Sequence, residues 1–453
     1  MSILLVPLDD RPCCTQFVQR LAAMAGRELV LPDRLGNFLS PGDPEAMLAA
    51  MDEPHEALLV SLDMVAWGGL VASRAQKEPL ETARERLERA ALLASGRPAC
   101  AFQSIMRTAP TQTSRQEVEL AEKLVELSVL TARRDPRASA LRATLPADYL
   151  EDYLTRRKRA HQLNRLAIDQ AGQGSWRELL LGIDDSRTEG WNVLEILELE
   201  PLLPSNASIA PGTDEMALLL FTRLVRLTRA IQVLWFPDES ARRVGRYEDR
   251  SLLRVVQAQA RAAGLTLGAS RRQLWVYGPL GDQGEACEQP ADGSERADAF
   301  VNKLREGLEG GLEIAVADVA HANGGDLPLL QSLVASGLAP QLIGYAAWNT
   351  AGNTLGTALS VLGCWPEQAG PAQQRARLRF LMERLLDDGY YQAEIRQHGG
   401  TAGLKDVPQS QLDSIRRELS QRLDRLTSAG FPSERLQVEL PWGRLFEVRL
   451  QVA

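Results

Sequence analysis

Two adjacent aspartates, Asp184 and Asp185, directly follow an apolar run at 178–183. Neighbouring carboxylates repel each other, so the pKa of one rises while the other stays ionised. Such a pair suits acid–base catalysis, because one group can deliver a proton while the other stabilises charge. Consecutive residues of a regular strand point to opposite faces, so both carboxylates can serve one site only if the strand ends at the pair. The Ser and Gly residues of the segment 186–192 are consistent with such a break.

Polar residues also follow the other apolar runs of the chain. The candidate ligand-binding residues at these positions are Asp9, Asp10, Arg11, Asp63, Arg107, Asp214, Glu215, Asp318, His321, Asn323, Asp326, Trp348 and Asn349. Where parallel strands close into a barrel, their carboxyl ends open on one face, and the chemistry is found there. The competing interpretation is helix capping, because Asp, Ser, Thr and Asn before a helix accept hydrogen bonds from free N–H groups. Arg11 and Arg107 either neutralise the neighbouring acids or hold a substrate oxygen.

Metal and nucleophile chemistry find little support in the sequence. The five cysteines show no C-x-x-C spacing, and of the four histidines only His321 follows an apolar run. The nucleophile motif G-x-S-x-G and the P-loop are absent from the sequence. We therefore expect no metal and no cofactor. The residues that could build an oxygen-rich Mg²⁺ or Mn²⁺ site are Asp9, Asp63, Asp184, Asp318 and His321.

The remaining polar set suits a polyhydroxylated ligand. Asp and Asn side chains hydrogen-bond to hydroxyl groups, and Trp67, Trp191 and Trp348 lie near the ends of apolar runs. A tryptophan ring can stack on the apolar face of a sugar, and core packing is the competing interpretation for each of the three. The low number of histidines is consistent with a glycosidase, because the acid and the base of a glycosidase are carboxylates. We expect a small carbohydrate as the ligand.

These residues must be positioned by a repeated alternation of short apolar runs and amphipathic helical stretches. The runs are four to eight residues long and apolar on both faces, which is typical of parallel strands covered by helices. They lie at 3–8, 57–62, 99–105, 178–183, 207–210, 231–236, 273–278, 313–318 and 342–348. No G-x-G-x-x-G follows any run, so the pattern favours a (β/α)8 TIM-like barrel over a dinucleotide-binding sheet.

The organisation of the chain follows from where this alternation is interrupted. We expect a catalytic domain at 1–365 that carries a helical insertion at 114–176, after its third strand. At 366–453 we expect a helical C-terminal appendage that ends in a β-hairpin around a Pro-Trp-Gly turn.

Composition narrows the class of protein. The 453 residues carry a net charge of −8, which argues against a general nucleic-acid or anionic-membrane binder. No stretch reaches the roughly 18 apolar residues of a membrane span, and the N-terminal run lacks the basic start and cleavage site of a signal peptide. We expect a cytoplasmic protein without a membrane or nucleic-acid partner.

Five motifs carry a resemblance to a known family. They are PLDDRP (7–12), GIDD (182–185), PGTDE (211–215), ANGGD (322–326) and AWNTAGNTLG (347–356), and together they span 7–356. In these motifs the chain resembles a bacterial family catalogued as a domain of unknown function. That family is similar to glycoside hydrolases that remove terminal β-linked N-acetylhexosamine, including N-acetylgalactosamine.

The resemblance implies a retaining, substrate-assisted mechanism. In such enzymes the 2-acetamido oxygen of the substrate attacks the anomeric carbon, and two consecutive acids assist. By the resemblance, Asp184 polarises the acetamido group and Asp185 is the general acid/base, unless the order is reversed. The candidate ligand-binding residues would then line the sugar site.

Two alternatives from other classes stay open. The first is a metal-dependent barrel hydrolase or lyase for a small carboxylated substrate, with Asp9, Asp63, Asp318 and His321 as ligands. The second is a sugar-binding protein without turnover, in which Arg11 or Arg107 holds the aspartate pair in ion pairs.

Overall fold

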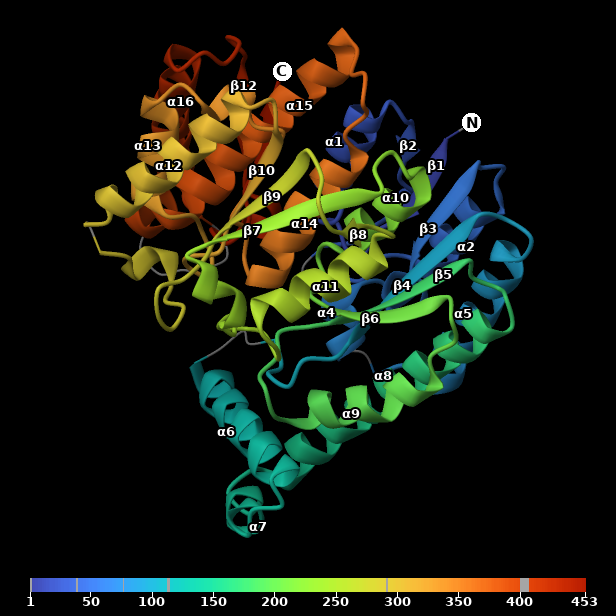
Figure 1. The fold of residues 1–453 in the computed structure, drawn as a ribbon. Coiled ribbons are helices and arrows are strands. Elements are labelled where there is room, and N and C mark those ends of the chain that lie inside the picture. Colours follow the sequence, from blue (N-terminus) through green and yellow to red (C-terminus); the bar gives the residue numbers. More distant parts are fainter. Residues whose placement is uncertain (1, 38–39, 76, 112–114, 291, 400–406) are drawn as a thin grey trace. The chain divides into compact units, whose positions relative to one another are not determined.

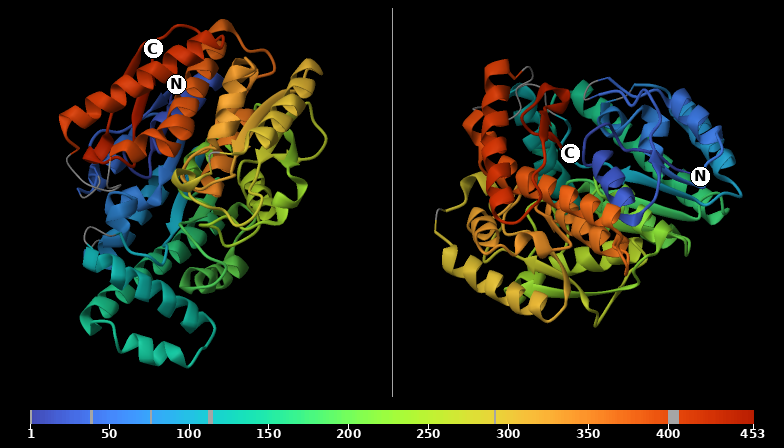
Figure 2. Two further views of the ribbon diagram at one scale, coloured as in Figure 1. Left: turned by 90° about the vertical axis from the view of Figure 1, so that its left-hand side faces the viewer. Right: turned by 90° about the horizontal axis from the view of Figure 1, so that it is seen from above.

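The structure is a computed structural model that describes residues 2–37, 40–75, 77–111, 115–290, 292–399 and 407–453 (Figure 1, Figure 2). The chain divides into two compact units. Unit 1 comprises Met1–Asp10, Glu28–Leu220 and Tyr247–Arg250, and unit 2 comprises Arg11–Arg27, Phe221–Arg246 and Ser251–Ala453. Both are built from parallel strands and helices, which confirms the predicted parallel α/β class. The division falls at other places than the expected boundary at residue 365.

Unit 1 contains a six-stranded parallel sheet in the order β2-β1-β3-β4-β5-β6. Its strands are β1 (Ile3–Val6), β2 (Leu29–Val30), β3 (Ala57–Ser61), β4 (Ala99–Ile105), β5 (Glu178–Ile183) and β6 (Ala207–Pro211). In register, Leu58 pairs with Ala99 and Phe102 pairs with Leu180. Every residue of β1, β3 and β4 is buried, as expected for runs that are apolar on both faces.

The helices of unit 1 pack against this sheet, and some of them form an insertion that projects away from it. They are α2 (Pro44–Asp52), α3 (Leu62–Trp67), α4 (Leu70–Ala75), α5 (Leu80–Ala94), α6 (Arg115–Ala132), α7 (Arg137–Arg142), α8 (Ala147–Gly172), α9 (Trp191–Leu199) and η1 (Glu200–Leu202). Helices α6, α7 and α8 fall between β4 and β5, where the sequence predicts an insertion, and α7 lies far from the sheet of unit 1 (Figure 1, Figure 2). Helix α10 (Met216–Val225) begins in unit 1 and ends in unit 2.

Unit 2 contains a five-stranded parallel sheet in the order β11-β10-β9-β7-β8. Its strands are β7 (Ala230–Phe236), β8 (Thr266–Leu267), β9 (Arg272–Tyr277), β10 (Glu313–Asp318) and β11 (Gly344–Ala346). An antiparallel pair, β12 (Leu436–Glu439) and β13 (Arg449–Val452), flanks the Pro441–Gly443 turn. The helices are α1 (Gln16–Ala25), η2 (Asp238–Arg242), α11 (Leu252–Ala262), η3 (Ala286–Glu288), α12 (Ser294–Glu309), α13 (Leu327–Ala335), η4 (Ala339–Gln341), α14 (Ala351–Cys364), α15 (Pro371–Arg384), the π-helix η5 (Leu385–Tyr391), η6 (Ile395–Gly399) and α16 (Gln409–Ser428).

The two sheets share one connectivity. When the strands of each sheet are numbered along the chain, the first five lie in the spatial order 2-1-3-4-5 in both units. This is the doubly wound order, in which ligands bind outside the carboxyl ends of the strands where the winding direction reverses. The reversal lies between β1 and β3 in unit 1 and between β7 and β9 in unit 2. The pairings of the described residues include no closed sheet, so the (β/α)8 barrel stays a prediction.

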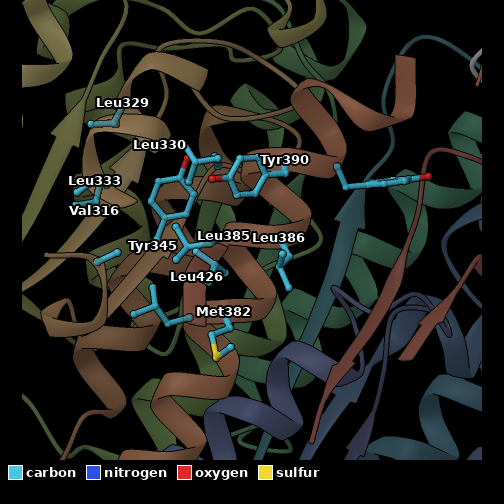
Figure 3. Packing of buried hydrophobic residues seen from close by; sticks show 14 of the residues in the cluster. Val316, Leu329, Leu330, Leu333, Tyr345, Met382, Leu385, Leu386, Tyr390 and Leu426 are labelled. Atoms are coloured by element: carbon cyan, nitrogen blue, oxygen red, sulfur yellow. The ribbon is translucent and has the colours of Figure 1, made fainter. Parts of the chain in front are cut away.

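The core of unit 2 joins segments that are far apart in the sequence (Figure 3). Val316 of β10 and Tyr345 of β11 belong to the same cluster of buried residues as Met382 of α15 and Leu426 of α16. Residues on both sides of position 365 therefore share one apolar core. In the described part of the chain, no helix combines the length and the apolar character that crossing a membrane requires.

Candidate functional site

The strand that leads to Asp184 and Asp185 ends before the pair. Strand β5 stops at Ile183, and the chain bends at Asp185. The backbone N–H of Asp184 still donates to the carbonyl oxygen of Ile105 at 3.2 Å, but the N–H of Asp185 donates to Oδ1 of Asp184 at 3.0 Å. Regular strand geometry is thus lost at the pair, as one shared site requires.

An arginine binds each of the two carboxylates. Arg74 of α4 donates from Nη2 to Oδ2 of Asp184, and Arg107, just after β4, donates from Nη1 to Oδ2 of Asp185 at 2.7 Å. Each aspartate also lies within the electrostatic reach of the other arginine. The Asp184 side chain is 5% exposed and that of Asp185 is 36% exposed. Asp185 is therefore the more accessible member of the pair.

The surroundings separate the proton affinities of the two acids. Burial alone would raise the pKa of Asp184, but Arg74 and Arg107 hold this pKa below its ordinary value. Loss of solvent raises the pKa of Asp185; Arg107 opposes this rise, and the neighbouring charge of Asp184 adds to it. Asp184 therefore stays ionised, and Asp185 is the group with the greater affinity for a proton.

A third carboxylate, Asp63, lies beside this pair. It belongs to the first turn of α3, directly after β3, and is 3% exposed. Its two oxygens accept hydrogen bonds from the Ser104 backbone N–H at 2.7 Å and from the Ser104 hydroxyl at 3.0 Å. Burial raises the pKa of Asp63 to about 7, against the lowering effect of Ser104 and Arg74.

Two glycines of the predicted motifs allow the end of β6 to pack against β5. A Cβ atom on Gly182 would lie 2.4 Å from the sulfur of Met216, and one on Gly212 would lie 1.8 Å from Oε1 of Glu215. Gly212 also has a φ of +91°, which favours glycine. The carboxylate of Glu215 occupies the space that a side chain at 212 would need, and Asp214 and Glu215 are both buried.

Asp9 and Asp10 follow β1, at the reversal of the winding in unit 1. The turn between α3 and α4 covers this strand end: the N–H of Leu70 donates to the Leu8 carbonyl oxygen at 3.2 Å. A Cβ on Gly69 would lie 3.8 Å from that of Asp9. Unit 1 thus holds eight of the predicted residues: Asp9, Asp10, Asp63, Arg107, Asp184, Asp185, Asp214 and Glu215.

The other predicted residues belong to unit 2: Arg11, Asp318, His321, Asn323, Asp326, Trp348 and Asn349. Asp318 accepts hydrogen bonds at Oδ2 from the Asp326 N–H at 2.7 Å and from the Tyr345 hydroxyl at 2.9 Å. Burial and the charge of Asp326 raise the pKa of Asp318 to about 6. Asp326 caps α13 through the Leu329 N–H, and its carboxylate lies 3.3 Å from Nε2 of His321.

The remaining polar residues of unit 2 join neighbouring loops. Asn323 donates from its amide to Glu285 at 2.8 Å, and its backbone N–H donates to the Asn349 carbonyl oxygen at 2.7 Å. Asn349 donates to Asn353, which forms a capping box with Thr350 at the start of α14.

Two predicted residues of unit 2, Trp348 and Arg11, each lie beside an aromatic ring. Trp348 is buried and meets Phe446 edge to face at 5.7 Å, so it packs in the core of this unit. The Arg11 guanidinium lies 5.7 Å from the Trp442 ring.

The predicted residues do not include Arg74, Ser104 or a second aspartate pair, Asp387 and Asp388. Arg74 sits within a short helix away from any strand end, and the polar Ser104 inside the apolar run of β4 was the available signal for Asp63's partner. The second pair lies in the π-helix η5.

Asp388 of this second pair is fully buried and supports the loop after β11. It binds Arg384 at 2.5 Å and accepts a hydrogen bond from the Ala347 N–H at 2.9 Å. Burial raises the pKa of Asp388 to about 7. A second Asp-Asp dipeptide within an apolar stretch was the signal for this pair.

Comparison with known proteins yields one family. Residues 3–451 match the family described as "Protein of unknown function (DUF4127)". No curated protein matches the sequence. The match confirms membership in a family of unknown function, and the resemblance to β-N-acetylhexosaminidases stays a prediction.

Proposed function

Because the chain belongs to the DUF4127 family, whose description gives no activity, we propose its function from the aspartate pair itself. We infer a glycoside hydrolase that releases terminal β-linked N-acetylhexosamine, with N-acetylgalactosamine as the first candidate, by a retaining, substrate-assisted mechanism. The observation that carries the proposal is the asymmetry of the pair. Asp184 is buried with a lowered pKa, and the more exposed Asp185 has a raised pKa.

The proposed roles follow from this asymmetry. The ionised Asp184 accepts a hydrogen bond from the acetamido N–H while the acetamido oxygen attacks the anomeric carbon. Asp185 protonates the leaving glycosidic oxygen and then removes a proton from the attacking water. Arg107 binds Oδ2 of Asp185, so we assign the transferred proton to Oδ1. The proposal needs no closed barrel, because an open parallel sheet also gathers its strand ends at one edge.

One observation favours a second candidate, a sugar-binding protein without turnover. That alternative expects the pair to be held in ion pairs, and Arg107 does bind Asp185 while Arg74 binds Asp184. An arginine contact favours the ionised carboxylate and therefore opposes proton donation. The potential ligands of the metal-dependent alternative are divided: Asp9 and Asp63 lie in unit 1, and Asp318 and His321 lie in unit 2.

A panel of 4-nitrophenyl glycosides, assayed with and without EDTA, separates the three candidates. We expect turnover of a β-N-acetylhexosaminide that EDTA does not affect. Asp184→Asn and Asp185→Asn should each lose about 10²- to 10⁴-fold in kcat, the usual contribution of such a group. Asp52→Asn, an exposed position at the end of α2 in the same unit, is the matched control.

The two variants should differ in their dependence on the leaving group. A poor leaving group needs a proton more than 4-nitrophenolate does, so Asp185→Asn should lose more activity on an alkyl glycoside, whereas Asp184→Asn should lose similar activity on both. Unchanged activity of Asp185→Asn would refute its role as the acid. Tight sugar binding without turnover would establish the second candidate, and inactivation by EDTA would establish the metal-dependent one.

A further inference from the structure

Helix α8 presents two consecutive arginines to the segments that carry the arginines of the site. Arg156 donates from Nη1 to the carbonyl oxygen of Arg74 at 3.1 Å. Arg157 donates from Nη1 to the carbonyl oxygen of Arg107 at 3.2 Å. Arg74 and Arg107 in turn bind the two carboxylates of the aspartate pair. Each aspartate is therefore joined to α8 through one arginine of the site, whose side chain binds the aspartate and whose carbonyl oxygen accepts a hydrogen bond from an arginine of α8.

Arg157 is held more rigidly than an arginine at a surface. It is 4% exposed, and its Nη2 donates to Glu195 of α9 at 2.7 Å. Its Nη1 also contacts the hydroxyl of Tyr153 at 3.3 Å, and that hydroxyl donates to the carbonyl oxygen of Thr108 at 2.8 Å. Two side chains of α8 thus fix two consecutive carbonyl groups, those of Arg107 and Thr108, directly after β4.

Helix α9 holds the loop after β5 in the same way. Asn192 donates from its amide to the hydroxyl of Ser186, the residue after the aspartate pair, and accepts a hydrogen bond from the Thr108 hydroxyl at 3.4 Å. The loop that carries Arg107 and the loop that carries Asp185 are therefore tied to each other through Asn192. The separation of Arg107 from Asp185 is set by these helices and not by the strands alone.

We propose that Arg157 and Arg156 are positioning residues: Arg157 holds Arg107 against Asp185, and Arg156 holds Arg74 against Asp184. Through Arg107, Arg157 sets the pH range in which Asp185 carries its proton. The inference about proton transfer rests on the proposed function, but the titration of Asp185 can be measured without turnover. The charged groups that face Asp185 are Arg107, Asp184 and Arg74.

The expected direction follows from the contact at Asp185. The charged and titratable groups that face Arg157 are Glu195, Tyr153 and His161. If Arg157 is lost, Arg107 moves away from Asp185 and the carboxylate is less stabilised, so Asp185 should titrate at higher pH. At an effective dielectric constant of about 20, lengthening this contact by about 1 Å raises the titration midpoint by about one pH unit.

The test compares Arg157→Met and Arg157→Lys with Lys158→Met. Lys158 is exposed on the same helix, so its loss removes the same charge without touching either arginine of the site. The titration of Asp185 is followed by the carbon NMR signal of aspartates labelled at Cγ, assigned with Asp185→Asn. We expect an upward shift in Arg157→Met, a smaller one in Arg157→Lys, and none in Lys158→Met.

Two further measurements make the result decisive. Tyr153→Phe keeps the Arg157 side chain but removes the hydrogen bond to Thr108 and the hydroxyl that Arg157 Nη1 contacts. It therefore tests the same bracing if Arg157→Met fails to fold, and we expect a small upward shift. In turnover, the alkaline limb of kcat against pH should move upward with the NMR midpoint while KM changes little. An unchanged Asp185 titration in both Arg157→Lys and Tyr153→Phe would overturn the proposal. Absence of turnover by the wild type would instead refute the proposed function and leave the NMR result to judge the positioning role.

Discussion

Asp63 provides the sharpest quantitative test of the electrostatics of unit 1. The substitution Asp63→Asn preserves the shape of the side chain and its contacts, because the amide oxygen can accept from the Ser104 N–H while the amide nitrogen donates to the Ser104 hydroxyl. The variant removes a group that, at 3% exposure, is costly to ionise. The difference between the variant and the wild type therefore reports the proton at Asp63.

The sign and size of the effect follow from the pKa of Asp63. Folding raises this pKa from its ordinary value of 3.8 to about 7, so the folded protein binds this proton more tightly than the unfolded chain does. The resulting stabilisation is complete below pH 3.8 and is lost as the pH rises through 7. With 1.36 kcal/mol for each pKa unit, it falls by roughly 3 kcal/mol between pH 5 and pH 8. Asp63→Asn lacks this loss, so its stability relative to the wild type should grow by that amount.

Urea unfolding at pH 5, 6, 7 and 8, with both proteins measured side by side, gives the difference directly. Other buried acids titrate in the same range, but they are common to both proteins and cancel. Glu85→Gln, an exposed position on α5, should show no such trend. A difference between Asp63→Asn and the wild type that does not vary with pH would show that Asp63 is ionised throughout, and the reasoning from burial would then be wrong.

Two other substitutions test the packing and the charges described above. Gly212→Ala should lower the free energy of unfolding by about 2–4 kcal/mol, because the φ of residue 212 is +91° and the added Cβ would meet the Glu215 carboxylate. The control Gly96→Ala, where φ is +75° and no atom lies within 4 Å of the added Cβ, should lose about 1 kcal/mol. Equal losses in a thermal-unfolding comparison would contradict the steric argument. Tyr345→Phe removes the hydroxyl that donates to Asp318, so it should lose about 1–2 kcal/mol. The same change raises the pKa of Asp318 further above about 6, since that hydrogen bond lowers it, so urea unfolding should show a larger loss at pH 8 than at pH 5.

The long strands could be predicted from the sequence, because strands that are buried on both faces appear as continuous apolar runs. Each of the nine apolar runs coincides with a strand, from β1 to β11. The two-residue strands β2 and β8 were missed, since two residues show no periodicity. These short strands lie next to β1 and β7 and complete the 2-1-3-4-5 order in each unit. Without these two strands, nine apolar runs suggest a single parallel sheet that closes into a barrel.

The candidate site was predicted in part for a related reason. Residues that directly follow a strand, such as Asp63 and Asp184, could be selected because the strand itself is visible in the sequence. Arg74 and Arg157 reach the site from helices, and the helical period does not show which loop a long side chain contacts. Pairing depends on tertiary packing, so a sequence pattern contains no signal for it.

The assignment of α1 to unit 2 affects the order in which parts of the chain can fold during synthesis. Strand β1 ends within Met1–Asp10 of unit 1, whereas α1 packs against α15, with Phe17 against Phe380 at 5.7 Å and Arg20 bound to Glu383. The two residues of that ion pair are 363 positions apart. During synthesis β1 can pair with β3 early. The apolar face of α1, in contrast, stays uncovered until α15 has left the ribosome. Closing so long a loop is slow, so we expect the nascent chain to expose α1 as a binding site for chaperones.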